Sequence, residues 1–366
     1  MMRSWPEFVA QCKRFAWWFS KGLVIKFTLY EGKLQGSDAV FRCWVVGDSK
    51  FPIDFRSRIY EAEPRVVHVV RLPFFCIGRF LRSKEHSYDL FIGTLPIHRS
   101  NVLDADSSYT GPTMITQGID TSGGWDGIAA NMARAKRNWV NRFRAQPDLE
   151  FEISHSPEDL RFFYDRMLIP YVKTRFGALG DYDHFGRMEK MLSLGGFLMF
   201  VRKQGQRIAA TLCQMDTRML AYNRVGLLDG DERLLETGAL MAIYYGQVQI
   251  AVDHKLPLLD LKQSRPFLMD GVFQNKARWG ARVTRYGDAW TQAHYRFVKP
   301  TAGLARALEL CPLIVFDKQD MRALIGYTAS PEPTEVELKK LLTQYYLRGL
   351  KSVTVMTAQR TYDMAA

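Results

Sequence analysis

The chain has 366 residues, and its 50 Lys and Arg residues exceed its 38 Asp and Glu residues, giving a formal net charge of +12. Hydrophobic residues make up 47% of the chain, enough to bury a core, so a mainly disordered protein is excluded. The positive charge favours an anionic partner and leaves a phosphorylated ligand, a nucleic acid and a membrane surface open.

The five cysteines are scattered along the chain and form no CxxC pair. We therefore expect no disulfide framework, no metal site and a reducing compartment. No secretory signal is recognised, and the most apolar run, residues 66–81, is interrupted by Arg71, Pro73 and Arg79. These features predict a cytoplasmic protein.

The N-terminal segment predicts an amphipathic helix. Residues 5–19 place Trp5, Phe8, Cys12 and Phe15 at helical spacing, with basic residues around them. Such a helix either packs on its own domain or lies in a membrane interface. The second alternative would make the protein peripheral at the inner face of the membrane.

The next part of the chain predicts mainly β-structure. Candidate strands occupy residues 23–30, 39–46, 65–70 and 88–94, and residues 104–112 predict a polar loop. Residues 132–145 then predict a helix with a basic face, formed by Arg134, Lys136, Arg137, Arg142 and Arg144. That face is either a solvated surface or a contact for phosphates or anionic lipid.

The second half alternates helices and strands. Ser156 and Pro157 open a helix as N-cap and first residue, and we expect this helix to end before Pro170. A capping box at Thr334 and Glu337 opens another helix, expected to reach about residue 350. The remaining predicted elements are a helix at 184–194, strands at 197–202, 207–215 and 219–226, a helix at 237–254 and strands at 257–262 and 353–356.

This order of elements resembles the core of the GNAT acyltransferases. The blocks that carry the resemblance are Gly195–Ala210 (GGFLMFVRKQGQRIAA) and Arg224–Val252 (RVGLLDGDERLLETGALMAIYYGQVQIAV). Two further blocks, Ile169–Gly177 (IPYVKTRFG) and Ser264–Gly280 (SRPFLMDGVFQNKARWG), are similar to the FemAB-like, BioF2-type branch of the superfamily. The resemblance implies an α/β fold, with a mixed, largely antiparallel sheet flanked by helices.

The resemblance also implies a domain organisation, because FemAB-like proteins often contain two GNAT modules in tandem. We expect residues 1–130 to form a degenerate, β-rich first module and residues 131–300 to form the catalytic module. Residues 301–366 then form a C-terminal appendage with a helix and a short strand.

In the GNAT family the donor is usually acyl-CoA, and the resemblance implies that its pyrophosphate faces the start of the helix at 237–254. First-turn N–H groups lack partners within a helix and attract anions, which agrees with this placement. Gly238 would let the phosphates approach the backbone, and Arg233 would add positive charge. The predicted donor-binding residues are Arg233, Thr237, Gly238 and Ala239.

The donor turn departs from the family pattern at one position. Glu236 stands where the family has a glycine, and a carboxylate beside a pyrophosphate is electrostatically unfavourable. This departure leaves open the FemAB alternative, in which an aminoacyl-tRNA is the donor.

Acyl transfer to an amine needs a proton acceptor and groups that stabilise the oxyanion. Asp260 and Lys262 share one face of the predicted strand, and Tyr222 and Arg224 share one face of its neighbour. Asp260 and Tyr222 are therefore the catalytic candidates. The candidates for binding an anionic substrate are Arg224, Lys262, Arg265 and Lys276.

The resulting prediction is an N-acyltransferase that uses acetyl-CoA or acyl-CoA to acylate an amine on an amino sugar or a cell-envelope or exopolysaccharide precursor. One alternative is a tRNA-dependent peptidyltransferase of peptidoglycan cross-bridges. The other is a non-catalytic accessory protein of polysaccharide assembly, since a fold does not fix a function.

Overall fold

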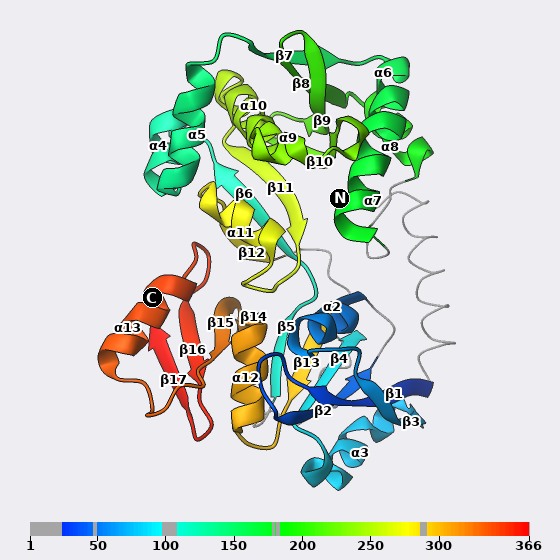
Figure 1. Cartoon of the computed structure of the whole chain (residues 1–366), viewed down its shortest axis with the longest axis vertical. Coiled ribbons are helices and arrows are strands. Elements are labelled where there is room, and N and C mark those ends of the chain that lie inside the picture. Colours follow the sequence, from blue (N-terminus) through cyan, green and yellow to red (C-terminus); the bar gives the residue numbers. More distant parts are fainter. Residues whose placement is uncertain are drawn as a thin grey trace.

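The computed structural model describes residues 24–46, 50–96, 108–177, 180, 184–285 and 291–365. Within these ranges the strands form three sheets flanked by helices (Figure 1). The predicted class, α/β with largely antiparallel sheets, is confirmed. The helix expected at residues 5–19 lies outside the described residues.

The first sheet has six strands in the order β3-β1-β2-β4-β13-β5. Their bounds are β1 Val24–Lys33, β2 Val40–Val46, β3 Arg65–Pro73, β4 Leu90–Pro96, β5 Ser108–Pro112 and β13 Thr291–Arg296. The four strands predicted in this region are confirmed by β1 to β4. The loop expected at residues 104–112 is wrong for its last part, because β5 pairs with β13 and thereby satisfies the backbone of polar residues.

Helices cover both faces of this first sheet. The helix α2 (Lys50–Ile59) buries Phe51, Phe55 and Ile59 against one face. On the other face α3 (Ile77–Ser83) packs Leu81 into a core that includes Trp44 and Phe91. We call this sheet and its helices the first lobe.

The second sheet has seven strands in the order β12-β6-β11-β10-β9-β8-β7. Their bounds are β6 Ile115–Asp120, β7 Leu149–Ser154, β8 Phe197–Lys203, β9 Gln206–Met215, β10 Met219–Leu227, β11 Leu258–Ser264 and β12 Arg282–Arg285. The predicted three-strand meander is confirmed by β8, β9 and β10, which pair antiparallel. Its first turn places Gln204 and Gly205 at positive φ, as a two-residue hairpin loop requires. This sheet and its helices form the second lobe.

The helices of the second lobe lie in two layers. One layer contains α4 (Gly124–Asn131), α5 (Arg134–Arg144) and α10 (Ala239–Asp253), whose apolar residues share a core. The other layer contains α6 (Pro157–Phe162), the π-helical segment η5 (Phe163–Leu168), α7 (Ile169–Phe176) and α8 (Phe185–Ser193). Short turns η7 (Leu228–Gly230) and α9 (Arg233–Glu236) link β10 to α10.

The helix opened by Ser156 does not end before Pro170, so that expectation is wrong. The π-helical segment η5 shifts the hydrogen-bond pattern, and Pro170 falls in the first turn of α7, where its missing N–H leaves no bond unmade. The helix therefore continues to Phe176.

The third sheet contains β14 (Leu313–Asp317), β15 (Asp320–Gly326), β16 (Ser352–Met356) and β17 (Thr361–Ala365). With α12 (Ala302–Leu310) and α13 (Glu335–Tyr345) it forms the C-terminal unit. The predicted capping box at Thr334 and Glu337 is confirmed. The helix ends at Tyr345 rather than near residue 350, because the chain beyond it turns to bond with β12 through Arg348.

The two lobes exchange strands across the boundaries expected at residues 130 and 300. The strand β6 belongs to the second sheet although it precedes residue 130, and β13 returns to the first sheet between β4 and β5. The chain therefore crosses between the lobes twice, and Figure 1 shows the first crossing where β5 leads into β6.

A glycine in β10 tests how tightly the second lobe is packed. A Cβ at Gly226 would lie 2.6 Å from the backbone carbon of Met167 in η5, so Gly226→Ala forces strand and helix apart. We expect the free energy of unfolding to fall by about 1–3 kcal/mol in urea titrations. Gly127→Ala is the control, because nothing lies within 4 Å of its added Cβ and alanine favours α4. Equal stability of the two variants would contradict this packing.

Candidate functional site

The two parallel strands of the second sheet separate after a short contact. The strands β10 and β11 pair only from Met219 to Ala221 and from Leu258 to Asp260. Beyond this contact β10 continues along β9, and β11 continues along β6. Each strand shifts register there, β10 between Tyr222 and Arg224 and β11 between Asp260 and Gln263. A bulge in each strand thus directs the two strands apart.

The bulge in β11 is held by charged side chains. Lys262 has a φ of 56°, a left-handed conformation that is strained for a residue with a side chain. Its N–H donates to Oδ1 of Asp260 at 2.7 Å, and its Nζ lies 3.1 Å from Oδ2 of Asp260. Lys276 of α11 (Gly271–Arg278) donates from Nζ to the carbonyl of Gln263 at 2.8 Å. The structure thus brings together three predicted site residues, Asp260, Lys262 and Lys276.

Lys276 is 1% exposed, so its amine lies inside the lobe. Burial lowers the pKa of Lys276 to about 7, although Asp260 and Asp270 act in the opposite direction. Its Nζ also lies 3.4 Å from the carbonyl of Lys262, so the amine contacts both carbonyls of the bulge. A buried amine in this position stabilises the backbone of β11 by direct hydrogen bonds.

The start of α10 lies beside this separation. Gly238 is the N-cap at a φ of 87°, and a Cβ there would lie 2.4 Å from the ring of Trp139 in α5. Glycine is therefore required both by the backbone conformation and by the close approach of Trp139. Ala239 is buried, and the hydroxyl of Thr237 donates to the carbonyl of Leu234 at 3.0 Å.

The other predicted residues have different surroundings. The side chain of Arg233 is 87% exposed and pairs with Asp231 at 2.8 Å. Arg265 pairs with Asp54 of the first lobe at 2.7 Å. Arg224 is half-buried on β10, opposite Leu212 of β9. The backbone of Tyr222 pairs with Cys213, and its side chain lies outside the described part of the structure.

A cavity of about 620 Å³ opens between α7, α10, α11 and α13. Two guanidinium groups, from Arg175 and Arg278, line it, and no Asp or Glu of the described residues does. Its other lining residues include Tyr171, Leu240, Asn275 and Tyr345. A ligand that fits such a lining carries both an anionic group and an apolar group. We call this space the arginine cavity.

A lysine from α5 stands behind one wall of the arginine cavity. Nζ of Lys136 lies 2.6 Å from Oδ1 of Asn275 and 2.8 Å from Sδ of Met241, in the first turn of α10. Burial lowers the pKa of Lys136 to about 8, and the positive charge of Arg278 acts in the same direction. Three cationic side chains therefore gather around the start of α10.

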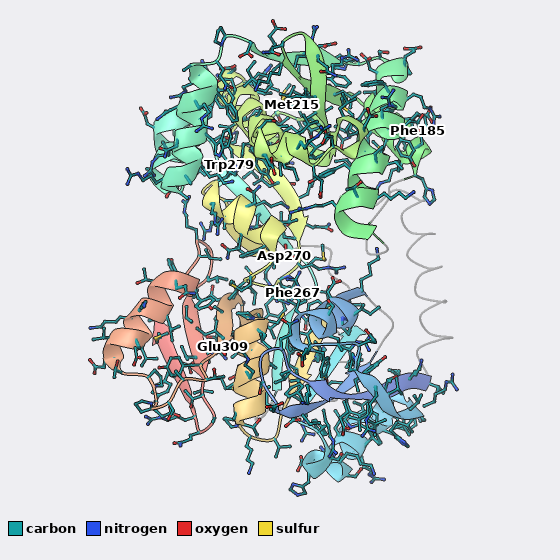
Figure 2. All side chains as sticks on the ribbon, in the orientation of Figure 1. Phe185, Met215, Phe267, Asp270, Trp279 and Glu309 are labelled. Carbon is teal, nitrogen blue, oxygen red and sulfur yellow. The ribbon has the colours of Figure 1, made fainter. Side chains whose placement is uncertain are left out.

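The first lobe helps to position the α11 wall of this cavity. Oδ1 of Asp270 caps α11 by accepting from the N–H groups of Val272 and Phe273, each at 3.0 Å. Oδ2 of the same carboxylate accepts from Arg58 of α2 at 2.7 Å. Beside it Phe267 stacks on Phe51 with 5.1 Å between ring centroids. Figure 2 shows Phe267 and Asp270 at the junction of the two lobes.

The residues that line the arginine cavity are not among the site residues predicted from the sequence. Three of the blocks that carry the resemblance nevertheless contain all of them except Gln344 and Tyr345: the lining residues lie in 169–177, 224–252 and 264–280. The predicted Ala239 and Lys276 are each one residue away from a lining residue, Leu240 and Asn275. The blocks therefore contained most of the lining residues, but the sequence did not show which side of each helix faces the cavity.

Of the basic face predicted for residues 132–145, the four arginines are exposed on α5, whereas Lys136 is turned inward to Asn275 and Met241. Arg134, Arg137 and Arg144 line a second, smaller cavity of about 290 Å³ together with Trp125 and Asp126. All three arginines are exposed, and within the described ranges none pairs with a carboxylate. The guanidinium of Arg144 lies over the ring of Trp125, 4.8 Å from its centroid.

Among the described residues, no group of three or more His, Cys, Asp or Glu side chains could hold a metal ion. In the same part of the chain, every helix is too short or too polar to cross a membrane.

No family model and no curated protein matches this chain. The solved structures that it matches include FemX, with 11% identity and a TM-score of 0.40 over 74% of this chain and 84% of that one. A C-terminal (DUF2156) domain of a putative lysylphosphatidylglycerol synthetase from Agrobacterium fabrum matches with 11% identity and a TM-score of 0.34, over 74% and 80% of the two chains. A tandem GNAT protein from the clavulanic acid biosynthesis pathway matches with 9% identity and a TM-score of 0.31, over 72% and 79%. Structures of GNAT and FemAB-like proteins are thus among those that this chain is similar to, as the sequence resemblance predicted.

The amine of Lys276 predicts a pH dependence of stability. Its folded pKa of about 7 lies below the ordinary value of 10.5, so between these values the unfolded chain binds a proton that the folded chain lacks. Stability therefore rises with pH across this window, by up to about 1.4 kcal/mol per pH unit. Lys276→Met should reduce that rise in urea unfolding measured at pH 6.5, 8 and 9.5, with the lowered pKa of Lys136 sustaining the remainder, and Lys190→Met, at an exposed site, should keep the full rise. An unchanged slope in Lys276→Met would refute the assignment.

Proposed function

We propose that this chain is an acyltransferase of the GNAT type that moves an acyl group from acyl-CoA to an amine. The observation that carries the proposal is the arginine cavity beside the first turn of α10. Arg175 and Arg278 supply two positive charges that no carboxylate of the described residues neutralises within ion-pair distance. A pyrophosphate is the group of the donor that such an environment stabilises.

The separated strands supply groups for the chemical step. The amine nitrogen attacks the thioester carbonyl, the C–S bond breaks, and the proton lost by the amine is taken up by the departing thiolate, which leaves as the CoA thiol. The register shift in β10 leaves Asn223 without a partner across the ladder with β9. In our proposal a backbone N–H at this bulge donates to the tetrahedral oxyanion.

Asp260 and Tyr222 are our candidates on the acceptor side. They lie on neighbouring strands at the point of separation, since Asp260 pairs with Ala221 and Tyr222 follows it. Both carboxylate oxygens of Asp260 contact Lys262. In our proposal this pair orients the acceptor amine and also holds the bulge of β11. The BioF2-like assignment and the acceptor, an amine on an amino sugar or a cell-envelope precursor, rest on the sequence resemblance. We place the reaction in the cytoplasm.

Binding of the donor tests this proposal directly. We expect CoA, acetyl-CoA and longer acyl-CoAs to raise the melting temperature of the protein and to bind in calorimetric titrations. Arg175→Ala and Arg278→Ala should each weaken binding about tenfold or more, because each removes a charged hydrogen bond to phosphate. Arg282→Ala is the matched control, since Arg282 is exposed on β12 and lies outside the lining. If no CoA compound at 1 mM shifts the melting temperature, the donor assignment is wrong.

The arginines of α5 favour a second candidate, an aminoacyl-tRNA donor. Arg134, Arg137 and Arg144 lie along one side of α5 and line one cavity, and phosphates of an RNA backbone would be attracted to them. On this alternative, tRNA binding weakens steeply as salt rises. Replacing the three arginines by alanine should then reduce the salt dependence of binding in filter or fluorescence assays, with little effect on CoA affinity.

A further inference from the structure

One wall of the arginine cavity comes from outside the second lobe. The helix α13 of the C-terminal unit contributes Gln344 and Tyr345, its last two residues. The remaining walls come from α7, α10, α11 and the residue Met269 that precedes α11. In Figure 1, α13 lies below α11. The catalytic module predicted from sequence, residues 131–300, therefore does not enclose the cavity by itself.

The segment that follows α13 is fixed to the second lobe. The N–H of Val283 in β12 donates to the carbonyl of Arg348 at 2.8 Å, and the guanidinium of Arg348 donates to the carbonyl of Gly280 at 3.0 Å. Gly349 has a φ of 99°, and a Cβ there would lie 2.1 Å from the carbonyl oxygen of Val283. These contacts fix the end of α13 relative to β12 and α11.

A shared core fixes the body of the C-terminal unit as well. Phe273 of α11 and Val283 of β12 are buried together with Ile325 and Val353 of the third sheet. Leu338 and Leu342 of α13 pack against the same core. The α13 wall is therefore a rigid part of the cavity, and its side chains set the space available to a ligand.

Tyr345 is the bulky side chain of this wall. It is half-buried, and burial raises the pKa of its phenol, which is therefore uncharged at neutral pH. The lining also holds the apolar surfaces of Tyr171, Leu240 and Val272. We propose that Tyr345 is a specificity-determining residue, which limits the size of the apolar group that a ligand of the arginine cavity can carry. This proposal rests on the proposed function in taking the arginine cavity as the donor site.

The first test compares donors of increasing size. Calorimetric titrations with acetyl-, butanoyl-, hexanoyl- and octanoyl-CoA give the ratio of long-chain to acetyl affinity for each variant. Tyr345→Ala should raise this ratio by about fourfold for each methylene group that the new space buries. Tyr345→Phe should keep the wild-type ratio, because it keeps the ring. Tyr346→Ala is the matched control, since Tyr346 is the next residue along the chain, its side chain is 42% exposed, and it lies outside the lining.

The second test requires no donor. Val272 lines the cavity and is 39% exposed, so Val272→Cys places a thiol there. Its reaction with alkyl methanethiosulfonates from methyl to decyl is followed by mass spectrometry at residue 272. When Val272→Cys is combined with Tyr345→Ala, the large reagents should react several-fold faster, whereas the rate of the methyl reagent should not change. When Val272→Cys is combined with Tyr346→Ala, neither rate should change. Tyr345→Leu serves in both tests if the alanine variant unfolds.

The outcomes separate this inference from the proposed function. If acyl-CoAs bind but neither the affinity ratio nor the labelling rates respond to Tyr345→Ala, the inference is overturned and the proposed function stands. If no CoA compound binds, the acyl-CoA donor is overturned, and the labelling rates alone decide the inference. Faster labelling by large reagents then supports a size limit at Tyr345, and unchanged rates overturn it.

Discussion

The candidate site depends on the bulge of β11, where a left-handed lysine backbone is held by charged side chains. A regular β11 would continue beside β10 as one parallel pair. Instead, the carboxylate of Asp260 accepts a hydrogen bond from the N–H of Lys262. The amine of Lys276, on α11, donates a hydrogen bond to the carbonyl of Gln263. The amine of Lys276 is buried, so water cannot replace its contact with β11. This internal contact helps to direct β11 away from β10.

The net charge of the chain becomes interpretable once the helices are in place. Arg175, Arg278 and Lys136 come from α7, α11 and α5, and they gather around the first turn of α10. Several other cations are neutralised locally, as Arg233 is by Asp231 and Arg265 by Asp54. Positive groups from separate elements thus meet at a cavity whose described lining contains no Asp or Glu.

The sequence predicted most elements of the fold and few residues of the cavity, for a physical reason. Alternation, N-caps and capping boxes are local signals, so strands such as β8 and β9 and the caps at Ser156 and Thr334 were found correctly. The π-helical turn before Pro170 and the pairing of β5 depend on distant partners and were missed. The same holds for the cavity, because neither spacing nor composition shows that Arg175, Arg278 and Tyr345 share one space. The role of Lys276 in the bulge likewise needed the position of α11.

The strand exchange between the lobes has a consequence for how the chain is made. In the first sheet β13 lies between β4 and β5, so β5 has no neighbour on that side until residues 291–296 exist. A ribosome therefore completes nearly the whole second lobe before the first lobe can close its sheet. During that interval the edges of β4 and β5 are open to other strands, which makes early capture of these edges by a chaperone advantageous.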